Sequence, residues 1–276
     1  MATVGGAAEP LRVVALPRPG LWLGSAVVAA LLVALAISLW RNPHIDRSVI
    51  AQFQFAPAIL KGLRTTVVLA VLAAVVGVAL GVVLAVMRLS PSPVLRLGSG
   101  FYTWIFRGTP LLVQILLWGN LALLFEHIGP FDTNTVMTPF VASVVALGLN
   151  EAAYMAEVIR GGILAVDRGQ FDASLALGMP RGLAMRRIIL PQALRVIIPP
   201  AGNQFISLLK ATSLVSVIAG GDLLTAAENI SSANLHTIEL MLVATFWYLT
   251  LTTITSLGQY VVERRLARAG TGMRAG

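Results

Sequence analysis

The residues of this chain that could take part in chemistry are few and stand far apart, and the most unusual is a lysine within an apolar stretch. Lys210 is followed by Thr212 and Ser213, and Asn203 and Gln204 precede it by about two helical turns. A lysine at the centre of a membrane helix costs ~2.5–3.5 kcal/mol. We therefore expect it to face the bundle interior or a wet cavity. There it either attracts a substrate carboxylate or has a structural or gating role, paired with a carboxylate or snorkelling to the outer surface.

Two carboxylates in the preceding apolar stretch, Glu151 and Glu157, are candidate partners of that lysine. Glu157 lies about one helical turn before Arg160, a spacing that favours an ion pair on one helix face. Such a pair would fix the root of the loop that follows, and we favour it over a proton relay. Glu151 lies nearly two turns deeper, so we expect its partner on another helix and a structural or gating role.

Other kinds of chemistry lack their residues in this sequence. It contains no cysteine, and its three histidines are isolated, so neither a thiolate nor a histidine pair with metal-ligand spacing is present. No G-x-x-x-x-G-K-[ST] phosphate loop occurs, so we expect the chain not to be its own ATPase. We predict a protein that is not an enzyme, with no catalytic or metal site and no cofactor of its own.

The composition indicates an all-α membrane protein. Of the 276 residues, 57% are hydrophobic and 12% are charged, whereas soluble domains carry about 25% charged residues. The first apolar stretch could be a signal peptide cleaved near Ala34-Leu35-Ala36, but it exceeds the usual ~7–15 residues, so we expect a retained anchor. Six stretches approach the ~20 residues that a spanning helix needs, at roughly 21–40, 64–87, 108–125, 139–159, 197–219 and 239–262.

The basic residues predict the orientation of these spans. The net charge of +8 could indicate nucleic-acid binding, but 18 of the 20 basic residues are arginine, and most lie at the ends of apolar runs. With the N-terminus inside, fifteen basic residues fall in inside segments and four in outside segments, as the positive-inside rule requires. We expect a cytoplasmic N-terminal segment (1–20), a cytoplasmic loop (160–196) and a basic cytoplasmic tail (263–276).

Small residues and prolines predict local features of the spans. Gly77 and Gly81 form a small-xxx-small pair that lets two helices approach closely. Proline at a helix start removes only a donor that has no partner there. We therefore expect helix starts at Pro110, Pro139, Pro199 and Pro200.

The loop between the fourth and fifth spans has a pattern of its own. We expect a short helix at 171–177, with Asp172 in its first turn, where the helix dipole favours a carboxylate. Ala173, Ala176 and Leu177 would share one face, and Gly178 would end the helix. A second segment at 182–189 would end before Pro191. This hairpin either docks a cytoplasmic partner or lies on anionic lipid.

The same loop resembles the EAA signature of permease subunits in bacterial ABC importers. That signature is an EAA triplet, three residues, glycine, nine residues and I-x-L-P, and here the triplet reads Asp172-Ala173-Ser174. All spacings are met, by Gly178, Ile188 and Leu190-Pro191. Further segments resemble the polar amino acid branch of the family (histidine-, glutamine- and arginine-type), namely Arg107–Leu111, Asn150–Tyr154, Arg160–Gly162, Ala176–Met179 and Lys210–Leu214.

The resemblance implies a MetI-type permease domain over residues 56–262, preceded by one extra helix. It implies a second permease subunit, identical or homologous, two ATPase subunits that bind ATP and magnesium, and an external binding protein. It implies import of a polar L-amino acid, with another small solute (opine- or ectoine-like) or an ion-driven transporter as alternatives. The residues expected to couple to the ATPase are Asp172, Ala173, Ser174, Ala176, Leu177, Gly178 and Met179.

Overall fold

The computed structural model describes residues 19–271, which fall into two compact units that meet at Asp46 and Arg47. The first unit holds α1 (Pro19–Arg41), so the helix predicted at 21–40 is present. Its 23 residues give a length of ~35 Å, and its stretch Leu23–Ala34 is apolar. The predicted N-terminal segment (1–20) lies almost wholly outside the described residues, as does the end of the predicted tail (263–276).

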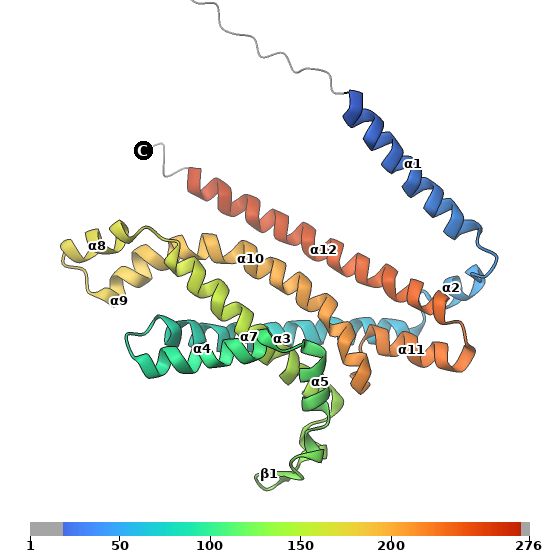
Figure 1. Ribbon diagram of the computed structural model, residues 1–276, viewed down its shortest axis with the longest axis horizontal. Coiled ribbons are helices and arrows are strands. Elements are labelled where there is room, and N and C mark those ends of the chain that lie inside the picture. Colours follow the sequence, from blue (N-terminus) through green and yellow to red (C-terminus); the bar gives the residue numbers. More distant parts are fainter. Residues whose placement is uncertain (1–18, 272–276) are drawn as a thin grey trace, which may run out of the picture. The chain divides into compact units, whose positions relative to one another are not determined.

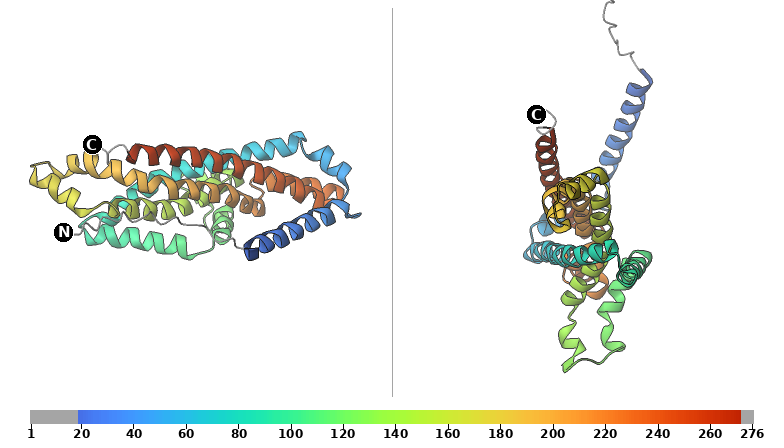
Figure 2. Two further views of the ribbon diagram at one scale, coloured as in Figure 1. Left: turned by 90° about the horizontal axis from the view of Figure 1, so that it is seen from above. Right: turned by 90° about the vertical axis from the view of Figure 1, so that its left-hand side faces the viewer.

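The second unit is built on long helices that run lengthwise beside one another (Figures 1 and 2). After the short α2 (Arg47–Phe53), they are α3 (Pro57–Leu89), α7 (Pro139–Leu164) and α12 (Thr237–Thr271). Within the described residues these three are long and apolar enough to span a membrane, and a bent pair of helices makes a fourth candidate. The count of six spanning helices therefore stays a prediction.

The single span predicted at 108–125 is wrong. The chain forms α4 (Pro93–Gly108), then a break, then α5 (Leu111–Gly119), which is only ~13 Å long. The break lies at Thr109, whose backbone is extended (φ −109°, ψ 145°), because a following proline disfavours the helical conformation. Apolar content alone did not reveal this break, although Pro110 does precede a helix start as predicted.

The helix predicted at 197–219 begins earlier and ends earlier. It is α10 (Leu190–Ala211), with Pro199 and Pro200 inside it rather than at its start. Membrane helices tolerate interior prolines. Gln259 of α12 donates a hydrogen bond to the Pro199 carbonyl (3.1 Å), which ties α12 to α10 at this point. A 3-10 segment, η3 (Thr212–Ile218), follows, and the chain then bends by 43° into α11 (Leu223–Asn234).

The core lies where α3 crosses α7, and two glycines permit the close approach. A Cβ at Gly77 would lie 2.4 Å from Glu151 Cγ, and a Cβ at Gly81 would lie 2.6 Å from Met155 Cβ. The prediction of a small-residue contact is therefore confirmed. Around it, buried side chains of α3, α5, α7, α10 and η3 form one cluster, which contains Leu69, Ile115, Leu147, Leu208 and Val215.

Candidate functional site

The loop after α7 forms a compact hairpin whose first helix ends in a glycine cap. The hairpin consists of α8 (Arg168–Ala176) and α9 (Arg181–Ala184). Gly178 adopts a left-handed conformation (φ +77°). Its N–H bonds to the Leu175 carbonyl (2.9 Å), and the Met179 N–H bonds to the Ser174 carbonyl (3.1 Å). This pair of bonds is a Schellman motif, which confirms that Gly178 ends the helix.

Small and apolar residues stand exposed along the second half of α8 and at its C-cap, as the helical spacing predicts. Ala173, Ala176 and Leu177 are exposed, and Leu177 is 82% exposed. Ser174, in contrast, is buried and donates a hydrogen bond to the Phe171 carbonyl (2.6 Å). A partner can therefore contact the two alanines and Leu177, whereas Ser174 lies on the buried side of α8.

Two details of the predicted hairpin are wrong. The helix α8 begins at Arg168, capped by Asp167, which accepts a hydrogen bond from the Gly169 N–H (2.6 Å). Asp172 therefore lies beyond the first turn, exposed on the surface. The second segment does not end before Pro191, because a π-helical turn, η2 (Met185–Ile189), carries α9 directly into α10. Pro191 stands at the start of α10, where its missing N–H costs little.

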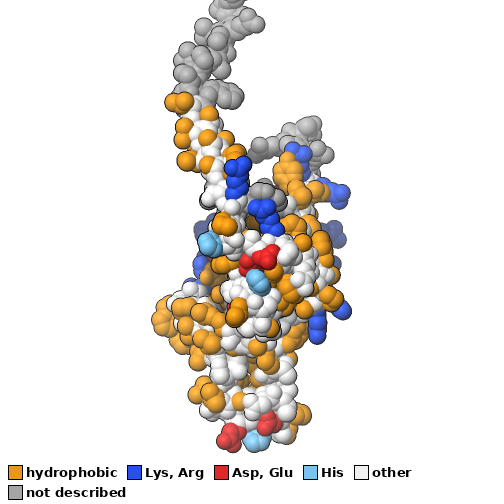
Figure 3. All heavy atoms as spheres, turned by 90° about the vertical axis from the view of Figure 1, so that its right-hand side faces the viewer, with side chains coloured by type: hydrophobic (Ala, Val, Ile, Leu, Met, Phe, Trp, Pro, Cys, Tyr) orange, Lys and Arg blue, Asp and Glu red, His pale blue; other side chains and the backbone are white. Residues whose placement is uncertain are grey.

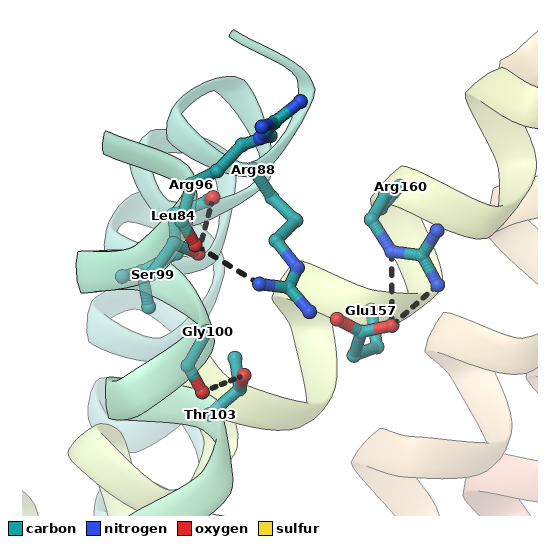
Figure 4. A network of polar contacts seen from close by, with 8 residues as sticks. All are labelled: Leu84, Arg88, Arg96, Ser99, Gly100, Thr103, Glu157 and Arg160. Carbon is teal, nitrogen blue, oxygen red and sulfur yellow. Dashed lines mark hydrogen bonds and ion pairs between the residues drawn. The ribbon is translucent and has the colours of Figure 1, made fainter. Parts of the chain in front are cut away.

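An ion pair stands at the root of the hairpin, as predicted from its spacing. Both Nε (3.0 Å) and a terminal nitrogen (2.7 Å) of Arg160 donate to the same oxygen of Glu157. Figure 4 shows Arg88 of α3 reaching between α4 and α7 toward this pair. Arg88 donates to the Arg96 carbonyl (2.9 Å) and lies flat against Gly100, where a Cβ would be 2.2 Å from its guanidinium.

Glu151 has the partner on another helix that the sequence led us to expect. It is buried in the contact between α3 and α7, and it accepts a hydrogen bond from Gln204 Nε2 of α10 (3.0 Å). Three helices therefore meet at this carboxylate. The side-chain amide of Gln204 therefore bonds to Glu151 and not to Lys210, six residues later in α10.

Lys210 lines a cavity of about 260 Å³ between α10, α11 and α12. Ser213 lines the same cavity, together with Thr245 and Tyr248. Within the described part of the chain no carboxylate comes within 4.0 Å of the lysine nitrogen, so the pairing with Glu151 or Glu157 does not form. Of the other pathway candidates, Thr212 is buried and donates to the Leu209 carbonyl (2.7 Å). Asn203 is exposed on α10, outside the cavity.

The sequence reasoning missed two buried polar clusters. In the first, Asn150 donates to Gln114 (3.1 Å) and to the Phe106 carbonyl (2.9 Å), while Gln114 donates to Thr109 Oγ1 (2.8 Å). This cluster fastens the break between α4 and α5 to α7. A signal existed in Thr109-Pro110, because a broken helix leaves carbonyls that need donors.

The second missed cluster surrounds Asp222, a fully buried residue at the bend between η3 and α11. Asp222 caps α11 by accepting from the N–H groups of Leu224 (3.0 Å) and Thr225 (3.2 Å). It also accepts from the hydroxyl of Thr225 and from Tyr248 of α12 (3.1 Å). The capping aspartate after two glycines was the available signal. Tyr248 thereby joins this bend to the cavity of Lys210.

The arrangement defines a helical membrane protein with an exposed helical hairpin between α7 and α10 and a cavity, lined by Lys210, between its helices. Residues 77–268 match the family described as "Binding-protein-dependent transport system inner membrane component". The chain belongs to this family, which confirms the resemblance read from the EAA-like loop and the MetI-type fold.

Individual relatives agree with this assignment. The chain is 41% identical to the arginine transport system permease protein ArgU of Corynebacterium glutamicum, over 95% of this chain and 85% of the relative. It is 37% identical to a putative glutamine transport system permease protein GlnP of Rickettsia bellii, over 77% of this chain and 96% of that one. Among solved structures, a chain of "an amino acid ABC transporter with histidines" superimposes with a TM-score of 0.72 at 38% identity, covering 80% of this chain and 99% of that chain.

Proposed function

We propose that this chain is the permease subunit of an ATP-driven importer of a polar L-amino acid. It would pair with a second permease subunit, receive its substrate from an external binding protein, and draw on two ATPase subunits that bind ATP and magnesium. Support for the substrate class comes from relatives whose names specify arginine and glutamine and from a structure named for histidine. All three are polar amino acids.

The observation that carries this proposal is the hairpin formed by α8 and α9. Its exposed face presents Ala173, Ala176 and Leu177 with little bulk, so a groove on an ATPase can close around it. The Schellman cap and the buried Ser174 make it one rigid piece, and the π turn joins it to α10 without a flexible link. Movement of a docked ATPase would therefore tilt α10, provided that nucleotide favours one arrangement of the ATPase over the other.

The orientation follows from the same hairpin. An ATPase works where ATP is, so the hairpin faces the cytoplasm, in agreement with the excess of arginine at that end. The protein would be a multi-pass protein of a bacterial inner membrane, with both termini in the cytoplasm. The outer ends of α3 and α12 would then face the binding protein.

Lys210 is the residue we assign to the substrate carboxylate. Lys210 lines a cavity together with Ser213, Thr245 and Tyr248, and no carboxylate of the described chain lies within 4.0 Å of its ammonium. Every α-amino acid carries an α-carboxylate, and a charge-assisted hydrogen bond to it contributes ~1.5–3 kcal/mol. We therefore expect Lys210→Met to raise the half-saturating substrate concentration about ten- to a hundredfold.

The test is reconstitution of the chain in liposomes with the ATPase and the binding protein encoded beside it. Uptake of arginine, glutamine, histidine and cystine is measured together with ATP hydrolysis. Stimulation of hydrolysis by the loaded binding protein, with uptake of at least one of these amino acids, is the expected result. Hydrolysis without uptake of any amino acid would favour another solute, and no association with the ATPase would overturn the proposal.

The chain supplies a matched control for the lysine. Lys61 is its only other lysine, lies on α3 and is absent from the cavity of Lys210. Lys61→Met should leave uptake unchanged, whereas Lys210→Met should weaken it with basal ATP hydrolysis retained. Equal uptake by both variants would remove Lys210 from the substrate pathway.

A further inference from the structure

A hairpin arm stands away from the helical bundle between α5 and α7. It comprises residues 120–138 and contains η1 (Leu121–Leu123), β1 (His127–Ile128), β2 (Phe131–Asp132) and α6 (Thr133–Val136). Figures 1 and 2 show it leaving the bundle across the direction of α3 and α12. It is ordered by its own bonds, which include the cap of Asp132 on α6 and the bond from the Thr133 N–H to the Glu126 carbonyl (2.9 Å).

The arm exposes a set of large apolar side chains outside the bundle. Leu123 is 84% exposed and Phe131 is 63% exposed. None of the exposed apolar side chains of the arm contributes to the core clusters of the described chain. Such a concentration of apolar surface marks a contact with protein or lipid. The exposed set is Leu123, Leu124, Phe125, Ile128, Phe131 and Val136.

Two observations argue against lipid as the occupant. Among residues 19–271 the two short strands pair only with each other, so the sheet has open outer edges, and open sheet edges do not occur exposed to lipid within the hydrocarbon region. The arm also lacks the tryptophan, tyrosine, lysine and arginine that anchor segments at membrane interfaces. Its charged groups are Glu126 and Asp132, and no basic residue occurs from 108 to 159.

The charge of the arm favours a second copy of this chain as its partner. Figure 3 shows acidic and histidine side chains at the tip of the arm, beside hydrophobic ones and without Lys or Arg. Glu126 and Asp132 form no ion pair among residues 19–271. Arg64, exposed at the start of α3, is also without an ion pair in that range. An acidic apolar arm complements a copy of the chain that offers an exposed arginine.

We propose that the arm docks on a second copy of this chain and helps to hold the two permease subunits side by side. The proposal rests on the proposed function only for the expectation that permeases pair, and it assigns a segment to that pairing. Because the arm packs on itself, substitutions on its exposed side should leave the bundle folded. The interface would then lie partly outside the helices.

Photo-crosslinking tests this contact directly. The whole complex is placed in nanodiscs, with two differently tagged copies of the chain, and Phe131→p-benzoylphenylalanine is irradiated. The expected product joins the two tagged copies. Capture of lipid alone, of the binding protein, of the ATPase or of a different permease subunit would overturn the proposal. In a second variant, Leu123→Ser with Phe125→Ser on the same background should lower the yield several-fold, and an unchanged yield would count against the arm.

A second position separates failure of this proposal from failure of the proposed function. Leu177 is about as exposed as Leu123 of the arm, but it lies at the end of α8 in the hairpin formed by α8 and α9. Leu177→p-benzoylphenylalanine should capture the ATPase and no second permease. If Leu177 captures no ATPase, the proposed function fails while the result at Phe131 stands. If Leu177 captures the ATPase and Phe131 captures no second copy, only the arm proposal fails.

Discussion

Gly178 permits a test of the coupling hairpin in which backbone conformation and side-chain size are separated. Its φ of +77° lies in the left-handed region, and a Cβ built there would meet no atom within 4 Å. Any substituent therefore has room, and the cost of replacing the glycine is conformational. A left-handed backbone costs a residue with a side chain ~1–2 kcal/mol, and asparagine adopts it far more readily than a β-branched residue does.

The magnitude follows from that strain. For Gly178→Val a cost of ~1–2 kcal/mol lowers the ratio of intact to unwound hairpin about 5- to 30-fold. The N–H bonds from Gly178 and Met179 that close the end of α8 would be lost together. We expect a smaller fraction of molecules to have an intact hairpin docked on the ATPase, while the helical bundle stays folded and inserted in the membrane. Gly178→Asn adds comparable bulk with little strain, so it should behave nearly as the parent chain does.

The assay is the number of amino acid molecules taken up per ATP hydrolysed in proteoliposomes. Gly178→Val should lower this ratio strongly, and Gly178→Asn should leave it close to the original value. A valine variant that couples as well as the original chain would refute the role of the hairpin. An asparagine variant as impaired as the valine variant would show that size at this position matters, and the strain argument would be wrong.

Two further substitutions test the packing and the polar cluster of the bundle. Gly81→Leu should lower the free energy of unfolding by ~1–3 kcal/mol or more, because even a Cβ would lie 2.6 Å from Met155. The measurement is the Tm of the purified protein, which should fall. An unchanged Tm would contradict the close contact of α3 and α7. Asn150→Leu leaves the Gln114 carbonyl oxygen without its donor, which should cost ~1–3 kcal/mol. Thermal unfolding of Asn150→Leu beside Asn203→Leu, an exposed asparagine, measures this cost, and equal Tm values would refute it.

Much of the helical framework could be predicted from apolar content and small residues. The stretch from 139 onward and the stretch around 239–262 lie within α7 and α12 because their apolar runs are unbroken. Gly77 and Gly81 were identified as a contact because only glycine lets two backbones approach so closely. The end of α8 was predicted because a left-handed cap has a strong residue preference.

The breaks in helices and the partners of buried polar groups could not be predicted in the same way. Average hydrophobicity continues through Thr109 although the helix does not, and Pro199 and Pro200 lie inside α10 although proline more often marks a helix start. The sequence suggested Glu151 and Glu157 as partners of Lys210. In the fold Glu157 pairs with Arg160, and Glu151 accepts a hydrogen bond from Gln204. Such pairings depend on which helix faces meet, and that information is not local.

The π turn that joins α9 to α10 fixes the rotational phase between the hairpin and the membrane helix. Each residue of an α-helix turns the chain by about 100°, so the wider turn at Met185–Ile189 sets the direction in which α8 points relative to the faces of α10. Loss of one residue from this turn would leave both helices intact but aim the hairpin elsewhere. The number of residues between Gly178 and the I-x-L-P segment therefore fixes the direction of the hairpin relative to α10 as well as its distance from that helix.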